Sequence, residues 1–444
     1  MKTPIYDFIK KYSESDTLRL HMPGHKGKTL LGPEPFDITE FDGADCLYSA
    51  SGIIKESESN ASALFGADTF YSTEGSSLCI RAMLFLARKY ALINNKKPLV
   101  LAGRNAHKSF LSAVALLDID VEWLYGKDCS YLSCDIDVNR LRKYLTNSKD
   151  LPVALYITSP DYLGNSVNVK GIAEVCREFD ILLLVDNAHG AYLKFLPESK
   201  HPIDLGATMC CDSAHKTLPA LTGASYLHIS KNAGEFFKNN VKDAMSLFAS
   251  TSPSYLILQS LDLVNAYLTR GYKERLYHTI ESVSHLKTEL VDYGYTLIGS
   301  EPLKVVLSVK PFGYNGFEFN ELLKKSNIVC EFYDQDYVVF MITTETETNG
   351  IERLKKLLLS ITKRKSVNDL PPKIVKPKRV MSVRDAVLSV SETVDIKDAK
   401  GRVLSSLAVN CPPAVPIIIS GEIIDEIVIS SLVYYGITKI EVVK

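Results

Sequence analysis

Short apolar runs alternate with amphipathic stretches between about residues 60 and 230 of this chain. The apolar runs are bounded by polar residues, which is typical of buried strands. We predict strands at 98–103, 120–125, 152–158, 181–186, 207–211 and 225–230. The segments 78–91 and 169–180 have apolar residues at the helical period and predict helices. Strands that alternate with helices predict an α/β fold with a mostly parallel sheet, covered by helices on both faces.

The remaining pattern predicts further domains. Residues 255–290 are expected to form long helices, and 302–362 combine three apolar runs with two helical stretches, which is typical of a smaller α/β domain. Residues 363–380 are basic and contain three prolines, so we interpret them as a solvated linker rather than a nucleic-acid-binding run. Beyond them we predict a helix at 382–390 and a strand at 416–420.

The expected organisation follows from these patterns. We predict an N-terminal arm at 1–50, a large domain at 51–260, a small α/β domain at 261–362, the linker at 363–380 and a C-terminal α+β domain at 381–444. The arm is rich in Gly, Pro, Asp and His and is expected to be extended, with short helical pieces.

Composition excludes several classes of function. The net charge is −1, so electrostatics gives no reason to expect nucleic acid or an anionic membrane as a partner. The nine cysteines include no CxxC pair, which favours reduced thiols in a cytoplasmic enzyme over a disulfide framework or a metal site. The first residues do not read as a signal peptide, and no apolar run approaches the length of a membrane span.

Lys216 is the strongest chemical signal, in the segment MCCDSAHKTLPALTGAS. A lysine just past a strand end, among small hydroxylated residues, suits a Schiff base with a carbonyl cofactor. Asp186 ends the apolar run thirty residues upstream. Because ligands bind at the carboxyl ends of such strands, the two residues are expected to meet. This pair is what pyridoxal 5′-phosphate (PLP) chemistry needs, since the carboxylate keeps the pyridine nitrogen protonated.

Other segments offer groups for the same cofactor. Gly75, Ser76 and Ser77 begin a helix and predict a phosphate cradle, although a plain N-cap serine explains them about equally well. His107 follows a strand and could stack on the cofactor ring, and Ala188 is small enough to pack under its other face. His107 could equally be a loop histidine at a helix start. His189 could contact substrate or cofactor, or could be a structural histidine.

The segments LHMPGHKG (20–27), STEGSS, RNAHKSF, TSPDYLG, VDNAHG, DSAHKTLPALTGAS, TSPSY and CPPAVPIIISGE (411–422) occur in this order. Together they resemble the Orn/Lys/Arg decarboxylases, PLP enzymes of the aspartate-aminotransferase fold type I. The resemblance runs from about residue 18 to the C-terminus. It implies that 51–260 is the PLP-binding large domain and that 381–444 is the decarboxylase C-terminal domain.

The resemblance also implies residue roles. Lys216 binds PLP, Asp186 pairs with the ring nitrogen, His107 stacks on the ring, and Ser76, Ser77, Ser213 and His215 contact the phosphate. Thr251 reaches the phosphate of the neighbouring subunit in a homodimer with shared sites, and His25 and Lys26 of the arm line the site. The wing domain of the large inducible decarboxylases is absent, so their higher-order assembly is not expected.

The chain departs from the family pattern at several positions. Cys411, Ala414 and Ser420 stand where Tyr, Gly and Pro are usual, and Gly223 stands where Gln is common. These differences bear on the substrate more than on the cofactor.

We therefore expect an enzyme that acts on a small-molecule amino acid. It decarboxylates lysine, ornithine or arginine and releases carbon dioxide. Glu40, Asp42 and Asp45 could meet the distal cation of such a substrate, or could be solvated loop charges. Two alternatives stay open: another PLP reaction, such as transamination, racemisation or C–S lysis, and a PLP-binding relative without turnover.

Overall fold

The computed structural model of the chain describes residues 1–127, 131–372, 376–407 and 414–444. Its largest sheet has seven strands in the order β1-β7-β6-β5-β4-β2-β3. Strand β5 is parallel to β6 and β2 to β3, whereas β7 is antiparallel to β1 and β6. The strands are β1 (Asp68–Ser72), β2 (Leu99–Gly103), β3 (Asp120–Leu124), β4 (Ala154–Thr158), β5 (Leu182–Asp186), β6 (Met209–Asp212) and β7 (Ser225–Ile229). The six predicted strands are confirmed, and β1 is an addition.

The chain divides into two compact units. The first contains residues 1–98, 152–156 and 169–275, and the second contains 99–151, 157–168 and 276–444. The domain boundaries given above stay a prediction.

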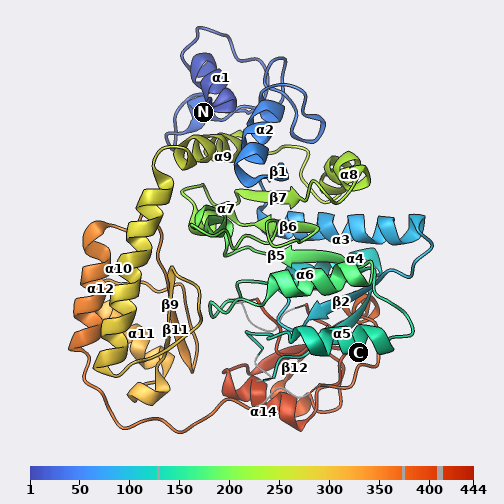
Figure 1. Ribbon diagram of the computed structural model, residues 1–444, viewed down its shortest axis with the longest axis vertical. Coiled ribbons are helices and arrows are strands. Elements are labelled where there is room, and N and C mark those ends of the chain that lie inside the picture. Colours follow the sequence, from blue (N-terminus) through green and yellow to red (C-terminus); the bar gives the residue numbers. More distant parts are fainter. Residues whose placement is uncertain (128–130, 373–375, 408–413) are drawn as a thin grey trace. The chain divides into compact units, whose positions relative to one another are not determined.

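In the first unit, α3 (Gly75–Ile93) packs on β5, β6 and β7 (Figure 1). The arm begins with α1, which packs on α2 and α9, and continues through two short 3-10 turns, Glu34–Phe36 and Leu47–Ser49. The other helices are α1 (Pro4–Ser13), α2 (Ile53–Phe65), α6 (Val169–Glu178), α7 (Ala214–Thr217), α8 (Glu235–Ser246) and α9 (Tyr255–Leu268), with a 3-10 turn at Ala191–Phe195.

Local sequence explains where several helices begin and end. Helix α2 stops at Gly66, whose φ of 70° lies in the left-handed region that glycine adopts without strain. Helix α9 starts at Ser254, whose side chain accepts the backbone N–H of Ile257 and thereby caps the helix. The serine-rich segment before α9 thus contains the N-cap of that helix.

The second unit contains β2, β3 and a separate four-stranded antiparallel sheet in the order β10-β11-β9-β8. Helices α10 and α12 lie side by side next to this sheet (Figure 1), joined by an ion pair between Lys355 and Glu289. The elements are α4 (Lys108–Leu117), α5 (Val138–Asn147), α10 (Tyr272–Tyr293), β8 (Thr296–Ile298), β9 (Lys304–Ser308), a 3-10 turn (Lys310–Phe312), α11 (Gly316–Lys325), β10 (Phe332–Tyr333), β11 (Tyr337–Met341) and α12 (Thr348–Ser360).

The C-terminal residues of this unit form a small α+β arrangement. Strands β12 and β13 pair antiparallel. The elements are α13 (Val383–Leu388), β12 (Ser391–Asp395), a 3-10 turn (Ile396–Asp398), α14 (Glu426–Tyr434) and β13 (Lys439–Val443). Their apolar side chains share one core with β9 and β11, in which Val306, Val339, Leu404, Ile418 and Leu432 are buried.

The predicted strand at 416–420 is wrong. The segment is buried but irregular, because the guanidinium of Arg104, rather than a neighbouring strand, donates hydrogen bonds to the carbonyl oxygens of Pro416 and Ile417. The real C-terminal strands lie at 391–395 and 439–443. Cys411 and part of the predicted linker lie outside the described residues.

The structure also bears on the cysteines and on the apolar helices of the chain. Seven cysteines in the part of the chain that the structure describes are free thiols. Across the same residues, no helix is both long enough and apolar enough to cross a membrane.

Candidate active site

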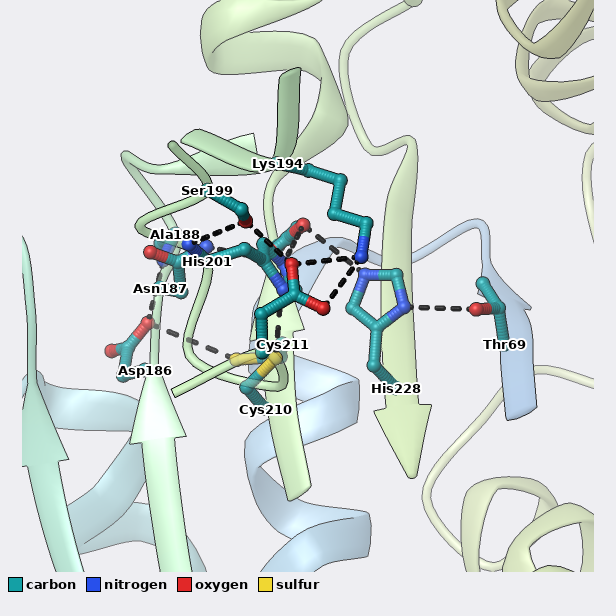
Figure 2. A network of polar contacts seen from close by, with 12 residues as sticks. Thr69, Asp186, Asn187, Ala188, Lys194, Ser199, His201, Cys210, Cys211 and His228 are labelled. Carbon is teal, nitrogen blue, oxygen red and sulfur yellow. Dashed lines mark hydrogen bonds and ion pairs between the residues drawn. The ribbon is translucent and has the colours of Figure 1, made fainter. Parts of the chain in front are cut away.

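Asp186 lies at the carboxyl end of β5 and is only 3% exposed. Its Oδ2 accepts a hydrogen bond from the hydroxyl of Tyr156 at 3.1 Å, and its Oδ1 accepts the backbone N–H of Ala188 at 3.2 Å. The thiol of Cys211 contacts Oδ1 at 3.8 Å (Figure 2). Burial raises the pKa of Asp186, while the positive charge of Lys216 and these hydrogen bonds oppose that rise.

Lys216 lies in the one-turn helix α7, directly after β6, as its sequence context predicts. Its Nζ lies 2.9 Å from Nε2 of His189, which follows β5 and is 6% exposed. In such a contact one nitrogen donates and the other accepts. The pair can therefore hold or pass one proton.

His215 is held as a neutral ring. Its Nδ1 donates to the carbonyl oxygen of Ala224 at 2.9 Å, so the proton of the neutral ring is on Nδ1 and Nε2 can accept. Burial lowers the pKa of His215, and the neighbouring charge of Lys216 adds to this effect. The ring can therefore accept a hydrogen bond near neutral pH.

The N-terminus of α3 is suited to an anion. Gly75 has a φ of 71°, and a Cβ built on it would meet no heavy atom of the described chain within 4 Å, so there is open space at this turn. The side chain of the N-cap residue, Glu74, makes no capping hydrogen bond in the described structure. The hydroxyl of Ser213 donates to Ser76 Oγ at 3.0 Å, which joins this helix start to the segment that carries Lys216. Backbone N–H groups at a helix start attract phosphate.

These residues fit pyridoxal phosphate. The first unit offers the primary amine of Lys216, the buried carboxylate of Asp186, and hydroxyl groups with open space at a helix N-terminus. The hydroxyls of Thr217 and Ser225 are also buried and have no hydrogen-bond partner among the described residues. Each chemical part of the cofactor thus has a suitable group.

A buried network around Asp212 joins the strand ends beside this site. Figure 2 labels three of its partners, Asn187, His201 and His228. Its Oδ2 accepts from Nε2 of His201 at 3.0 Å and from Nε2 of His228 at 3.1 Å. Its Oδ1 accepts from the side-chain amide of Asn187 at 2.7 Å. The nearby histidines and their hydrogen bonds outweigh burial and hold the pKa of Asp212 well below its usual range. The carboxylate is therefore an anion that links β6 and β7 to the turn after β5.

Two residues predicted to contact the cofactor, His107 and Thr251, lie at or before the starts of helices. His107 belongs to the second unit and caps α4, with its Nδ1 accepting the backbone N–H of Ser109 at 3.2 Å. This contact matches the alternative of a histidine at a helix start, and ring stacking stays a prediction. Thr251 is exposed just before α9.

The predicted substrate residues of the arm differ in their surroundings. His25 has Nε2 3.3 Å from Asp37 Oδ2, and Lys26 is exposed. Glu40 is partly buried, and Asp42 is exposed. The Asp45 carboxylate accepts backbone N–H groups at the start of α2, including those of Gly52 at 2.8 Å and Ile54 at 3.0 Å. Asp45 therefore serves a helix cap, and its contact with substrate stays a prediction.

The sequence did not single out the groups that surround Asp186 and Lys216. Tyr156 and Cys211 were part of predicted strands, but no partner was assigned to them. Asn187 and Asp212 were also overlooked, although each directly follows or precedes a residue assigned to the site. The available signal was their position at strand ends, where polar side chains reach the ligand edge of a parallel sheet.

Two departures from the family pattern lie at positions where the backbone is left-handed. Gly223 has a φ of 95°, and a Cβ there would lie 2.9 Å from the carbonyl oxygen of Thr73, so a glutamine would not fit this backbone. Ala414 has a φ of 56°, the left-handed conformation that suits the glycine usual at this position.

Comparison with protein-family models gives two matches. Residues 3–298 match "Orn/Lys/Arg decarboxylase, major domain", and residues 361–437 match "Orn/Lys/Arg decarboxylase, C-terminal domain". An arginine decarboxylase of Bacillus subtilis is 29% identical over an alignment that covers 96% of this chain and 92% of that protein. The biodegradative arginine decarboxylase of Escherichia coli is 26% identical over 59% of this chain and 39% of its own length.

Solved structures show the same fold. A lysine decarboxylase of Francisella novicida superposes with a TM-score of 0.81 at 18% identity, covering 100% of this chain and 81% of that one. The constitutive lysine decarboxylase of Escherichia coli superposes with a TM-score of 0.79 at 18% identity, covering 100% of this chain and 82% of that one. The predicted PLP-dependent fold type I is thereby confirmed.

Proposed function

Because this chain belongs to the Orn/Lys/Arg decarboxylase family and is a PLP-dependent decarboxylase, we propose that its substrate is a basic amino acid. The products are carbon dioxide and agmatine, cadaverine or putrescine, from arginine, lysine or ornithine. The observation that carries the proposal is the match of both family domains along the chain, at 3–298 and 361–437. Arginine is the first substrate to test, since relatives aligned over 96% of the chain are named arginine decarboxylases.

The cofactor is held by residues at the carboxyl ends of β5 and β6. Lys216 carries it through Nζ. Its phosphate is bound by the N-terminus of α3 at Gly75, Ser76 and Ser77, by the hydroxyl of Ser213, and by His215. The negative charge of the phosphate favours the protonated imidazole of His215, whose Nε2–H then donates to a phosphate oxygen. The open space at Gly75 and the bond of 3.0 Å between Ser213 and Ser76 support this arrangement. Ala188 contacts one face of the ring.

The reaction breaks the bond between the α-carbon and the carboxylate, and a proton then replaces carbon dioxide on the α-carbon. Bound PLP supplies a carbonyl for attachment and a ring that accepts the electron pair of the broken bond. Asp186 keeps the ring nitrogen protonated, for which its ionised form is required. Lys216 and His189, whose nitrogens are 2.9 Å apart, deliver the proton.

The distal end of the substrate is recognised by the arm. His25, Lys26, Glu40, Asp42 and Asp45 lie in this segment, and its carboxylates complement a distal ammonium or guanidinium group. A site built for such a cation rejects apolar amino acids, because its polar groups would lose their partners.

The enzyme works as a homodimer with shared sites. Several large apolar side chains of the arm are exposed in the chain alone, among them Leu20 at 81%, Leu30 at 87% and Leu31 at 90%. Burial of these leucines against a partner chain would remove apolar surface from water, which supports the proposal. Thr251, also exposed, contributes to the partner's phosphate site. The free thiols support a cytoplasmic location.

Product analysis tests the proposal. Purified protein with added PLP is incubated with arginine, lysine, ornithine and an apolar control such as leucine, and the products are identified by mass spectrometry. We expect carbon dioxide and the amine from one basic substrate. Keto-acid formation without carbon dioxide would instead support a transaminase. PLP absorbance without any turnover would support a binding protein that has lost activity.

A further inference from the structure

The Asp186 carboxylate is enclosed by side chains from the two strands that flank β5. The hydroxyl of Tyr156, on β4, donates to Oδ2 at 3.1 Å, and the thiol of Cys211, on β6, lies 3.8 Å from Oδ1. Both side chains have 0% exposure. The carboxylate is therefore held on each oxygen by a proton donor that water does not reach.

From this geometry we infer that Tyr156 and Cys211 are positioning residues that keep Asp186 ionised and fixed in one orientation. The inference rests on the proposed function, in which Asp186 pairs with the ring nitrogen of PLP. It adds two residues from neighbouring strands that contact neither substrate nor reacting atoms and act through Asp186.

The physical reason is the cost of a buried charge. Burial alone favours the neutral carboxyl, and a neutral carboxyl cannot hold a pyridine nitrogen protonated. Hydrogen bonds donated to the ionised form oppose this effect. The thiol of Cys211 keeps its proton and can donate, because burial raises its pKa far above the ordinary value.

The charged and titratable groups around Asp186 come from four elements. Tyr156 lies on β4, Cys211 on β6, Lys216 on α7, and Cys79 on α3, where the charge of Asp186 contributes to the raised pKa of its thiol. Lys216 favours the carboxylate through its positive charge. When pH falls through the pKa of Asp186, the carboxylate is lost. Removing a donor raises that pKa, so the loss then begins at higher pH.

The decisive variant is Tyr156→Phe, which deletes one hydroxyl. A donor of this kind is expected to change the pKa of its carboxylate by about one unit. We therefore expect the acid-side midpoints of PLP affinity and of the visible absorbance of the PLP-loaded protein to move up by about one pH unit. The matched control is Tyr226→Phe, because Tyr226 is equally buried but donates to Asn265, at 3.2 Å. The control should leave both midpoints in place.

A second pair of variants tests the thiol. Cys211→Ala should move the same midpoints in the same direction by less, since a thiol is a weaker donor. Cys176→Ala removes a thiol that is 2% exposed on α6, without a carboxylate partner among the described residues, and should have no effect. Unchanged midpoints in both Tyr156→Phe and Cys211→Ala would overturn the inference.

Asp186→Asn separates this inference from the proposed function. If Asp186→Asn abolishes the absorbance transition and most turnover while Tyr156→Phe moves nothing, the function stands and the inference fails. If Asp186→Asn itself leaves the absorbance and the rate unchanged, the assigned role of Asp186 fails first. Infrared difference spectra of the apo-protein against Asp186→Asn report the carboxyl protonation directly and do not depend on activity.

Discussion

Nζ of Lys216 and Nε2 of His189 lie 2.9 Å apart, although the two residues are separated by 27 positions in the chain. The turn after β5 makes this approach possible. A Cβ on Gly190 would lie 2.0 Å from Oδ1 of Asn187, so a larger residue would push this turn out of place. The side-chain amide of Asn187 is in turn fixed by Asp212. A glycine and a buried carboxylate thus set the position of the imidazole beside the amine.

Lys216 is predicted to be the attachment point of the cofactor. Borohydride reduction should fix PLP on the peptide that contains Lys216, and peptide mass spectrometry identifies that peptide. Lys216→Ala should abolish turnover, with weak PLP binding retained through the phosphate and ring contacts. As a control, Lys231→Ala changes a lysine that lies after β7 and is exposed. Label on any peptide other than that of Lys216 would contradict the assignment.

Thr251 is predicted to complete the site of the partner chain. Thr251→Ala and Lys216→Ala should each have low activity alone. Random mixing of the two chains should recover about one quarter of the wild-type rate, because half of the dimers are hybrids with one intact site. The measurement is the rate after the two chains are unfolded and refolded together. A fully active monomer in light scattering would be incompatible with shared sites.

Because Arg104 and Glu422 form a buried ion pair, we predict that Glu422→Ala greatly lowers the free energy of unfolding. The guanidinium is 2% exposed, and Nη2 lies 3.5 Å from Glu422 Oε2. Glu422→Ala leaves this charge buried without its counter-ion, which costs about 3–5 kcal/mol. Glu392→Ala, which breaks a surface pair with Arg402, should cost much less, because water screens that pair. Urea unfolding gives both values, and equal losses would show that the buried pair adds nothing.

The buried carboxyl of Asp262 should make the free energy of unfolding depend on pH. Its carboxylate is fully buried and accepts the backbone N–H groups of Ile5 at 2.9 Å and Tyr6 at 3.0 Å. Burial raises its pKa to about 6. Between about pH 4 and 6 the unfolded chain loses this proton before the folded chain does, so stability falls as pH rises through this window.

The Asp262 contribution is on the order of 3 kcal/mol, from a rise of roughly two pKa units. Asp262→Asn should flatten this part of the curve of unfolding free energy against pH. The exposed Asp16 provides the matched control, Asp16→Asn. A curve of unchanged slope in Asp262→Asn would assign the pH dependence to other groups.

The sequence predicts the parts of this fold that depend on local pattern. The apolar runs that became β2 and β4 to β7 are visible because strands buried on both faces are almost continuously apolar. The positions of Asp186 and Lys216 follow, since both come directly after such runs. The expected strand at 416–420 failed because burial alone does not distinguish a strand from an irregular segment whose carbonyls meet a buried arginine.

The groups around the site depend on strand order, which the sequence does not give. Asp212 meets His201 and His228 because β6 pairs with β7 and the loop before β6 returns to it. Tyr156 meets Asp186 because β4 and β5 are neighbours in the sheet. No sequence motif or characteristic separation identifies these contacts. They emerge only when distant segments are brought side by side.

The contact of Arg104 with the carbonyls of Pro416 and Ile417 limits how this protein can be divided. The C-terminal segment supplies the oxygen atoms that neutralise and solvate a guanidinium near the start of the second unit. A chain that ended at residue 362 would leave the Arg104 guanidinium without these oxygen atoms. It would also expose Val306 and Val339, which pack in one core with Leu404 and Ile418. The C-terminal region is therefore not an exchangeable module. Swaps between relatives should transfer it together with the segment around Arg104.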